Sequence, residues 1–276
     1  MSLLVGALVT RKPYKEIVVK LSVINFKIVE DVAVISMNNP PVNALTPAFL
    51  DDFEKVVENI GQAGEARSVL LASECNDFFS AGDDITKLKE IDEEMIALLP
   101  RVHAVLNRFE ALALPTVAAI DGHALGGGLE LALTCDFRFM GEDCGRIGLP
   151  EVRLGMIPAF GGTQRLPQVV GKTKAIEMMF KGLQITAGEA LGIGLVNDVF
   201  KQPELYEKSF NYARRLALQA TGALGWIKRC VHEGLHNGFD KGLALEREAF
   251  GKNIVTFDAK EGVDAFLSGR KPEFRG

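Results

Sequence analysis

The amino-acid sequence predicts an α/β fold, because short apolar runs alternate with amphipathic runs over most of the chain. Near the start, apolar runs over residues 23–29 and 32–38 flank Glu30-Asp31, a pattern that predicts two strands and a turn. From Pro203 onward only helical patterns remain. We therefore expect three parts: an N-terminal extension over residues 1–22, an α/β core over residues 23–200 and a helical region over residues 201–276.

The other elements are predicted in order along the chain. Thr46-Pro47 provides an N-cap and a proline suited to the first helical position, which predicts a helix over residues 48–60. The apolar spacing then predicts a strand over 69–72, a loop over 76–85, a long helix over 92–109 and a strand over 114–120. Finally, Thr186-Ala187-Gly188-Glu189 is a capping box that predicts a short helix, and a last strand is expected over 196–200.

The composition excludes several classes of protein. The 276 residues are 47% hydrophobic and 24% charged, which is enough apolar sequence for one sizeable core. A net charge of −5 argues against nucleic acid as a partner, and no apolar run approaches the roughly 20 residues that a membrane span needs. The cysteines show neither CxxC pairing nor metal-ligand spacing, so we expect a reduced, cytoplasmic protein without a metal site; they are Cys75, Cys135, Cys144 and Cys230.

Two glutamates lie in glycine-rich surroundings. Glu130 follows Gly126-Gly127-Gly128-Leu129, and Glu151 follows Gly148-Leu149-Pro150. A helix beginning in the first run would present backbone N–H groups that lack intrahelical partners and carry partial positive charge, and both features stabilise an oxyanion. Glu130 lies about one helical turn after Gly127, so its carboxylate would share a face with that amide. The pair indicates acid/base chemistry at an activated carbonyl; the alternative is a tight turn into a buried helix, with both glutamates solvated.

Four segments carry a family resemblance, and they are residues 79–85, 120–130, 149–158 with 161–166, and 261–266. In this order they resemble the crotonase superfamily and most closely its enoyl-CoA hydratases. The resemblance runs from about Val23 to Phe274. It implies a crotonase (ClpP-like) spiral of repeated β-β-α units, followed by C-terminal helices that build a homotrimer or a dimer of trimers.

The resemblance also implies a reaction and a set of site residues. The reaction is reversible addition of water across the C2=C3 bond of a trans-2-enoyl-CoA thioester, with coenzyme A as part of the substrate and no separate cofactor. The backbone amides of Asp83 and Gly127 would bind the oxyanion, Glu130 would activate water, and Glu151 would exchange the proton at C2. The substrate and coenzyme A groove would include Val42, Ala44, Ala81, Asp83, Asp84, Ile85, Gly126, Gly127, Pro150 and Phe266.

Three positions depart from the family pattern. The family often has a small or apolar residue at Asp83 and a glycine at Ala159. It also has a basic residue at the position of Gly269, so the phosphate contacts could instead come from Arg270-Lys271 or Lys87. Three other candidates for chemistry are expected to have structural roles; they are His123, Arg165 and Cys135.

Other activities stay open at this point. An enoyl-CoA isomerase of the same superfamily uses one main acid/base carboxylate, so the presence of both glutamates favours a hydratase. Another acyl-CoA enzyme of the superfamily and a non-enzymatic acyl-CoA-binding subunit are the remaining alternatives. The acyl group itself is not predicted, because acyl pockets in the family are formed by variable loops.

Overall fold

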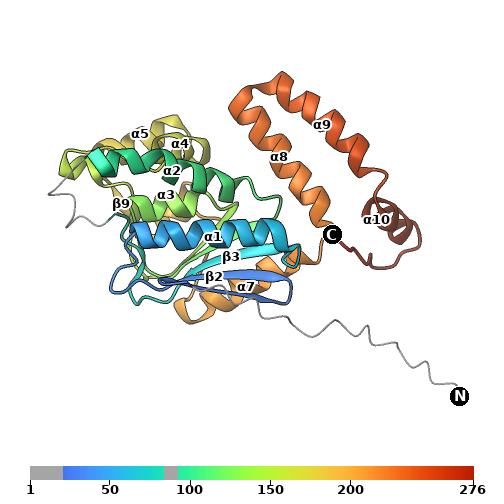
Figure 1. The fold of residues 1–276 in the computed structure, drawn as a ribbon, viewed down its shortest axis with the longest axis horizontal. Coiled ribbons are helices and arrows are strands. Elements are labelled where there is room, and N and C mark those ends of the chain that lie inside the picture. The colour runs from blue at the N-terminus through green and yellow to red at the C-terminus, as the bar shows by residue number, and fades with distance from the viewer. Residues whose placement is uncertain (1–20, 84–92) are drawn as a thin grey trace, which may run out of the picture.

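The computed structural model describes residues 21–83 and 93–276, so nearly all of the predicted extension over residues 1–22 lies outside the described residues. Its main sheet has the strand order β1-β2-β3-β5-β7-β10. The strands are β1 (Ile24–Val29), β2 (Val32–Met37), β3 (Ser68–Ser73), β5 (Thr116–Ile120), β7 (Phe137–Gly141) and β10 (Asp198–Phe200). Figure 1 shows two of these strands, β2 and β3, between helices α1 (Pro47–Ala63) and α7 (Gln202–Ala217).

One antiparallel pair begins this sheet, and the pairs after it are parallel. β1 and β2 form a hairpin, with the register Ile24 to Met37 and Val29 to Val32. Its turn residues Glu30 and Asp31 have φ values of 49° and 65°, the left-handed pair that a tight two-residue hairpin requires. The predicted turn and both predicted strands are therefore confirmed.

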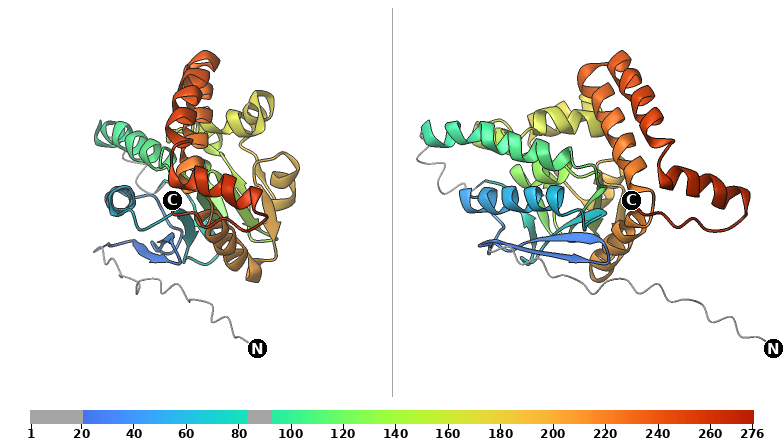
Figure 2. Two further views of the ribbon diagram at one scale, coloured as in Figure 1. Left: turned by 90° about the vertical axis from the view of Figure 1, so that its right-hand side faces the viewer. Right: turned by 45° about the vertical axis from the view of Figure 1, so that its right-hand side comes forward.

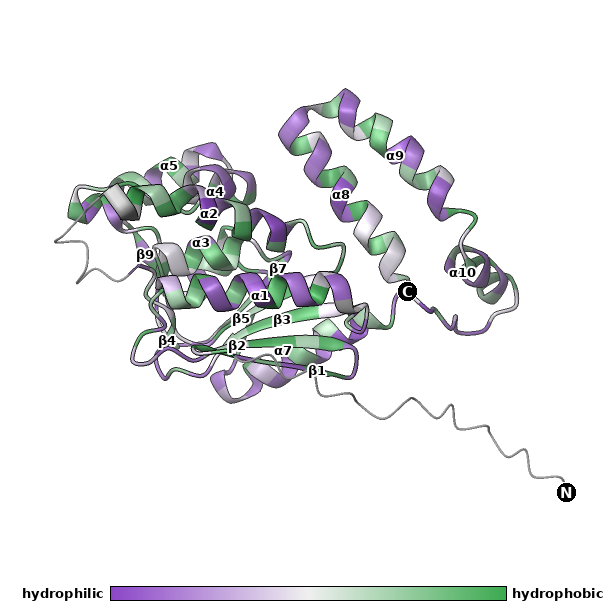
Figure 3. Ribbon diagram, viewed as in Figure 1, coloured by the Kyte–Doolittle hydropathy of each residue, from purple (hydrophilic) through white to green (hydrophobic). Residues whose placement is uncertain are grey.

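Helices cover both faces of the main sheet, and strand residues alternate between the two cores. In β3, Val69 and Leu71 belong to the core beneath α1 (Pro47–Ala63) and α2 (Glu93–Glu110). Leu70 and Ala72 belong to the core beneath α7 (Gln202–Ala217). Strands buried on both faces read as continuous apolar runs, which explains why they stand out in the sequence. Figure 3 shows β2 and β3 as hydrophobic and α1 as mixed.

A second, smaller sheet has the order β4-β6-β8-β9. It consists of β4 (Phe78–Ser80), β6 (His123–Leu125), β8 (Ile147–Gly148) and β9 (Gln184–Ile185), and its first three strands are parallel. The sequence pattern predicted a loop over residues 76–85 in part of this region, and it did not reveal these strands. Strands of two or three residues are too short to show the two-residue periodicity on which such predictions depend.

The predicted helical starts are also confirmed. Thr46 accepts a hydrogen bond from the Phe49 amide at the start of α1, and Thr186 and Glu189 form the predicted capping box of α6 (Ala187–Gly192). Two further helices, α4 (Gly162–Val170) and α5 (Lys172–Lys181), lie in the same part of the fold as α3 (Gly127–Leu133) and α2 (Figure 1).

The C-terminal part of the chain is helical, as predicted. Beyond the boundary expected near residue 200, α7 packs on the main sheet through Leu205 and Ala213. By contrast, α8 and α9 form a hairpin that projects from the core, and α10 follows it (Figure 2). These helices span Thr221–Asn237, Phe239–Asn253 and Phe257–Leu267. Among the described residues, no helix combines the length and the hydropathy of a transmembrane span.

Candidate active site

Three parallel strands of the small sheet end at one edge, and a candidate site segment follows each of them. Asp83 comes three residues after β4, Gly126 directly after β6, and Glu151 three residues after β8. The Gly126 amide donates to the Gly148 carbonyl over 3.0 Å, which joins the last two segments. Because the carboxyl ends of parallel strands meet at the same edge, segments far apart in the sequence converge there.

Backbone approaches backbone where the first two segments meet. Gly82 has φ +86°, and a Cβ atom built on it would lie 2.7 Å from the Gly127 nitrogen and 2.7 Å from the Leu125 carbonyl oxygen. A Cβ atom on Gly128 would overlap the Ser80 carbonyl oxygen. Only glycine avoids these clashes, so the glycine run brings the start of α3 against the residue that precedes Asp83.

Glu130 is buried on α3 and held by two backbone amides. Glu130 is only 2% exposed. Oε1 accepts hydrogen bonds from the Phe160 nitrogen over 2.8 Å and from the Gly162 nitrogen over 2.6 Å. The pKa of this carboxyl is raised from 4.5 to about 7, mainly by burial and also by the nearby Glu151 charge, which together outweigh the two hydrogen bonds. Glu130 can therefore exchange a proton near neutral pH.

Glu151 is the second carboxyl of the site and lies in a different environment. It is the first residue of a 3₁₀ turn over Glu151–Leu154 that ends at Gly155 in the left-handed conformation. Its Oε1 lies 3.1 Å from the position that a Cβ atom on Gly126 would occupy. Its Oε2 is buried without a hydrogen-bond partner among the described residues, and burial raises the pKa of this carboxyl. An unpartnered buried oxygen of this kind is suited to a water molecule or a substrate proton.

The segments predicted to form the groove are brought together next to the strand ends. Ala81 N donates to the Val42 carbonyl over 2.9 Å, Leu45 N donates to the Gly82 carbonyl over 2.8 Å, and Ala44 forms a parallel bridge with Gly82. The Gly126 carbonyl accepts from the Glu130 amide over 3.0 Å, a Cβ atom on Gly126 would lie 3.1 Å from Glu151 Oε1, and Pro150 directly precedes Glu151.

Asn43 is an organising residue that the sequence analysis missed. It is 1% exposed and has φ 49°, and its Nδ2 donates to the Phe79 carbonyl over 3.1 Å. The Ser80 hydroxyl donates to the Asn43 carbonyl over 2.7 Å and accepts from the Gly82 amide over 3.1 Å. Asparagine after Pro40-Pro41 is a weak signal for this role, because asparagine tolerates the left-handed conformation better than most residues.

Three residues were expected to have structural roles: Arg165 and His123 bond to backbone groups, and Cys135 is buried. Arg165 donates to the Phe160 carbonyl over 3.0 Å and pairs with Glu110 over 2.8 Å. His123 Nδ1 accepts from the Arg146 amide over 3.1 Å. Burial raises the pKa of the Cys135 thiol to about 12, so it stays protonated and cannot act as a nucleophile.

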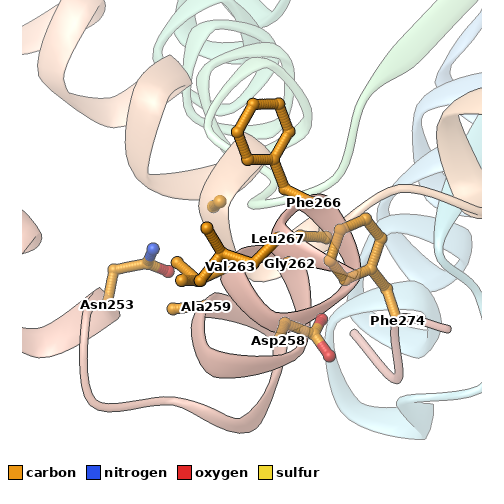
Figure 4. Close-up of a pocket in the computed structure, with 10 residues that line it drawn as sticks. Asn253, Asp258, Ala259, Gly262, Val263, Phe266, Leu267 and Phe274 are labelled. Atoms are coloured by element: carbon orange, nitrogen blue, oxygen red, sulfur yellow. The ribbon is translucent and has the colours of Figure 1, made fainter. Parts of the chain in front are cut away.

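Other residues predicted to contact coenzyme A either lie outside the described residues or lie away from this edge. Asp84, Ile85 and Lys87 lie outside the described residues. Phe266 is 84% exposed on α10, where it lines a surface pocket of 360 Å³ with Val263, Leu267 and Phe274 (Figure 4). Its assignment to the substrate groove stays a prediction and depends on a second copy of the chain.

The predicted source of cations for the phosphates also stays open. Arg270 pairs with Glu261, with Nη1 to Oε1 at 2.6 Å, so its charge is already matched within the chain. No cluster of three or more His, Cys, Asp or Glu side chains suited to a metal ion occurs in residues 21–83 and 93–276.

The fold and the two glutamates, Glu130 buried and Glu151 half-buried, define the class: an α/β enzyme with the crotonase fold. A family model described as enoyl-CoA hydratase/isomerase matches residues 27–276, and the chain belongs to this family.

Individual relatives cover nearly the whole chain. A probable enoyl-CoA hydratase of Bacillus subtilis is 38% identical over 93% of this chain and 100% of its own length. A short-chain-enoyl-CoA hydratase of Clostridium acetobutylicum is also 38% identical, over 88% of this chain and 93% of its own length. A solved structure of an enoyl-CoA hydratase from Geobacillus kaustophilus superposes with a TM-score of 0.90, at 36% identity and over 94% of this chain and 98% of that one.

Proposed function

We propose that this chain catalyses the reversible addition of water across the C2=C3 bond of a trans-2-enoyl-CoA thioester. The observation that carries the proposal is the pair of glutamates, Glu130 buried and Glu151 half-buried, at the edge where three parallel strands end. Glu130 has its pKa raised to about 7, and Glu151 has its pKa raised by burial. Two carboxyl groups with these properties can remove a proton from water and deliver one to carbon.

The negative charge that develops on the substrate during the reaction must be stabilised by hydrogen-bond donors, and backbone amides can supply them. Water attacks C3, the double-bond electrons move toward the conjugated carbonyl, and charge develops on the thioester oxygen. We assign its stabilisation to the amides of Asp83 and Gly127. The close approach of Gly82 to Gly127 supports this assignment, because it draws the two chain segments together. Preorganised amides in a site poor in water are among the strongest sources of rate enhancement.

The two glutamates divide the proton transfers. We assign Glu130 to orienting and deprotonating water, because its Oε1 is fixed by two amides and Oε2 is left for the water. We assign Glu151 to protonating C2, because burial favours its protonated form. An isomerase that moves the double bond needs only one main acid/base group, so two carboxyls with raised pKa values favour hydration.

The test is the loss of the conjugated enoyl-thioester absorbance when the purified protein meets short, long and aromatic trans-2-enoyl-CoAs, with the product identified by mass. We expect a gain of one water. An unchanged mass with a moved double bond would assign the chain to the isomerases. Tight coenzyme A binding without turnover of any of these substrates would point to a non-enzymatic binding subunit.

We also propose that the chain forms a homotrimer or a dimer of trimers through its C-terminal helices. Large apolar side chains are exposed on α8 and α9, among them Val231 at 53%, Leu235 at 60% and Phe250 at 68%. They line a groove of 580 Å³ between the two helices. Exposed apolar area of this kind is typical of an interface. Light scattering is expected to give three or six times the 30.0 kDa chain mass, and the mass of one chain would contradict the proposal.

A further inference from the structure

One peptide unit connects α2 to the buried Glu130. Its N–H, from Phe160, donates to Glu130 Oε1 over 2.8 Å. Its carbonyl oxygen, from Ala159, lies 2.6 Å from His103 Nε2 on α2. A carbonyl oxygen can only accept, so Nε2 must carry the hydrogen in this contact. The two ends of a single peptide plane are therefore held from opposite sides, by an imidazole and by a carboxylate.

The same face of α2 holds the next carbonyl of this loop as well. Asn107 lies four residues after His103 and Glu110 seven residues after it, so the three share one helix face. Arg165 bonds to Asn107 over 2.6 Å and to Glu110 over 2.8 Å, and it donates to the Phe160 carbonyl over 3.0 Å. Of these contacts, the His103 bond is the one that touches the peptide whose N–H reaches Glu130.

We infer that His103 is a positioning residue for the Glu130 carboxylate, acting through the peptide between Ala159 and Phe160. The inference rests on the proposed hydratase function, because it assigns Glu130 to water activation. His103 holds the carbonyl end of the peptide away from Glu130 and so keeps the N–H end directed at Oε1. If the peptide rotated, its carbonyl would face the carboxylate, a repulsive arrangement in a buried site. A donor on the carbonyl also polarises the peptide and strengthens its N–H as a donor.

The contact uses a single property of His103, the N–H donor at Nε2. A side chain with an N–H donor at the place of Nε2 can therefore replace histidine. Glutamine has such a donor, because its side-chain amide nitrogen is four bonds from Cα, the same number as histidine Nε2. Asparagine places its amide nitrogen only three bonds from Cα, at the place of Nδ1.

The experiment compares His103→Leu, His103→Gln and His103→Asn with the wild-type protein. For His103→Leu and His103→Asn we expect kcat for hydration to fall about three- to tenfold, the value of one neutral hydrogen bond, while KM changes by less than about twofold. We expect His103→Gln to restore kcat to within about twofold of wild type. In parallel, hydrogen exchange followed by mass spectrometry measures protection of the peptide that contains residues 159–162.

The outcomes separate this inference from the proposed function. Wild-type turnover is measured in the same series, so its absence would overturn the hydratase proposal alone. Faster exchange of the 159–162 peptide in His103→Leu and His103→Asn, with protection kept in His103→Gln, would still support the positioning contact. Unchanged kcat and exchange in His103→Leu would overturn the inference. Equal losses in all three variants would also overturn it, because they would indicate a packing role for the ring.

Discussion

Glu130→Gln is expected to lower kcat for hydration by about 100- to 10,000-fold with little change in KM. Glutamine keeps the shape of the side chain, and its Oε1 can still accept from Phe160 and Gly162. What it loses is the ability to take a proton from water. The measurement is the loss of enoyl-thioester absorbance over a range of substrate concentrations. Glu207→Gln, an exposed position on α7, is the matched control and should retain wild-type kcat.

The same variant is expected to be more stable than the wild type above neutral pH. The pKa of Glu130 is raised from 4.5 to about 7 in the folded protein, so the unfolded chain ionises first. Between these two values the folded wild type holds a proton that the unfolded state has lost. Its stability therefore falls as pH rises through this window and stays lowered above it. Glutamine cannot ionise and avoids this loss, which is up to about 3 kcal/mol.

Urea unfolding at pH 5 and pH 8 tests the stability difference. The variant should gain on the wild type between the two values, and the gain should be complete at pH 8. Comparing the two proteins largely cancels contributions from other titrating groups, although Glu151 is close enough to respond to the change. If the difference in unfolding free energy between the variant and the wild type were the same at both pH values, the fold would not raise the pKa of Glu130.

The elements that sequence reasoning located correctly are specified by short-range chemistry. Thr46-Pro47 and the capping box at Thr186 satisfy amides within their own helices, so a few adjacent residues determine where each helix begins. Long buried strands such as β2 and β3 stand out because both of their faces are apolar. The small sheet was missed because its strands of two to three residues are held by pairing with distant segments rather than by their own periodicity.

The same distinction between local and long-range chemistry applies to the candidate site. Both glutamates and the glycine run could be found from the sequence, because local spacing and a family resemblance point to them. The two amides that hold Glu130 could not, because Phe160 and Gly162 lie 30 and 32 residues away and reach it only in the folded protein. The pKa of Glu130 is also a property of the fold, since burial is its largest cause. Asn43 was missed for the same reason: two of its partners, Ser73 and Phe79, lie 30 and 36 residues away.

Gly82→Ala is expected to reduce kcat by about 100- to 1,000-fold, the loss associated with one oxyanion donor. The added methyl group would lie 2.7 Å from both the Gly127 nitrogen and the Leu125 carbonyl oxygen, and these are backbone atoms that cannot rotate away. The segment that leads to Asp83 must then move away from the start of α3, so the two proposed donors no longer converge on one oxygen. The φ of +86° adds backbone strain to the clash.

The control for this variant is Gly61→Ala in α1, where nothing lies within 4 Å of the added methyl group. A glycine in a helix interior is unfavourable relative to alanine, so this variant should keep wild-type kcat and gain about 0.5–1 kcal/mol in stability. Kinetics and thermal unfolding of both variants separate loss of the site from loss of the fold. If Gly82→Ala kept wild-type kcat, the close approach of Gly82 to Gly127 would not be what positions the donors, and the proposed oxyanion site would have to be assigned to other amides.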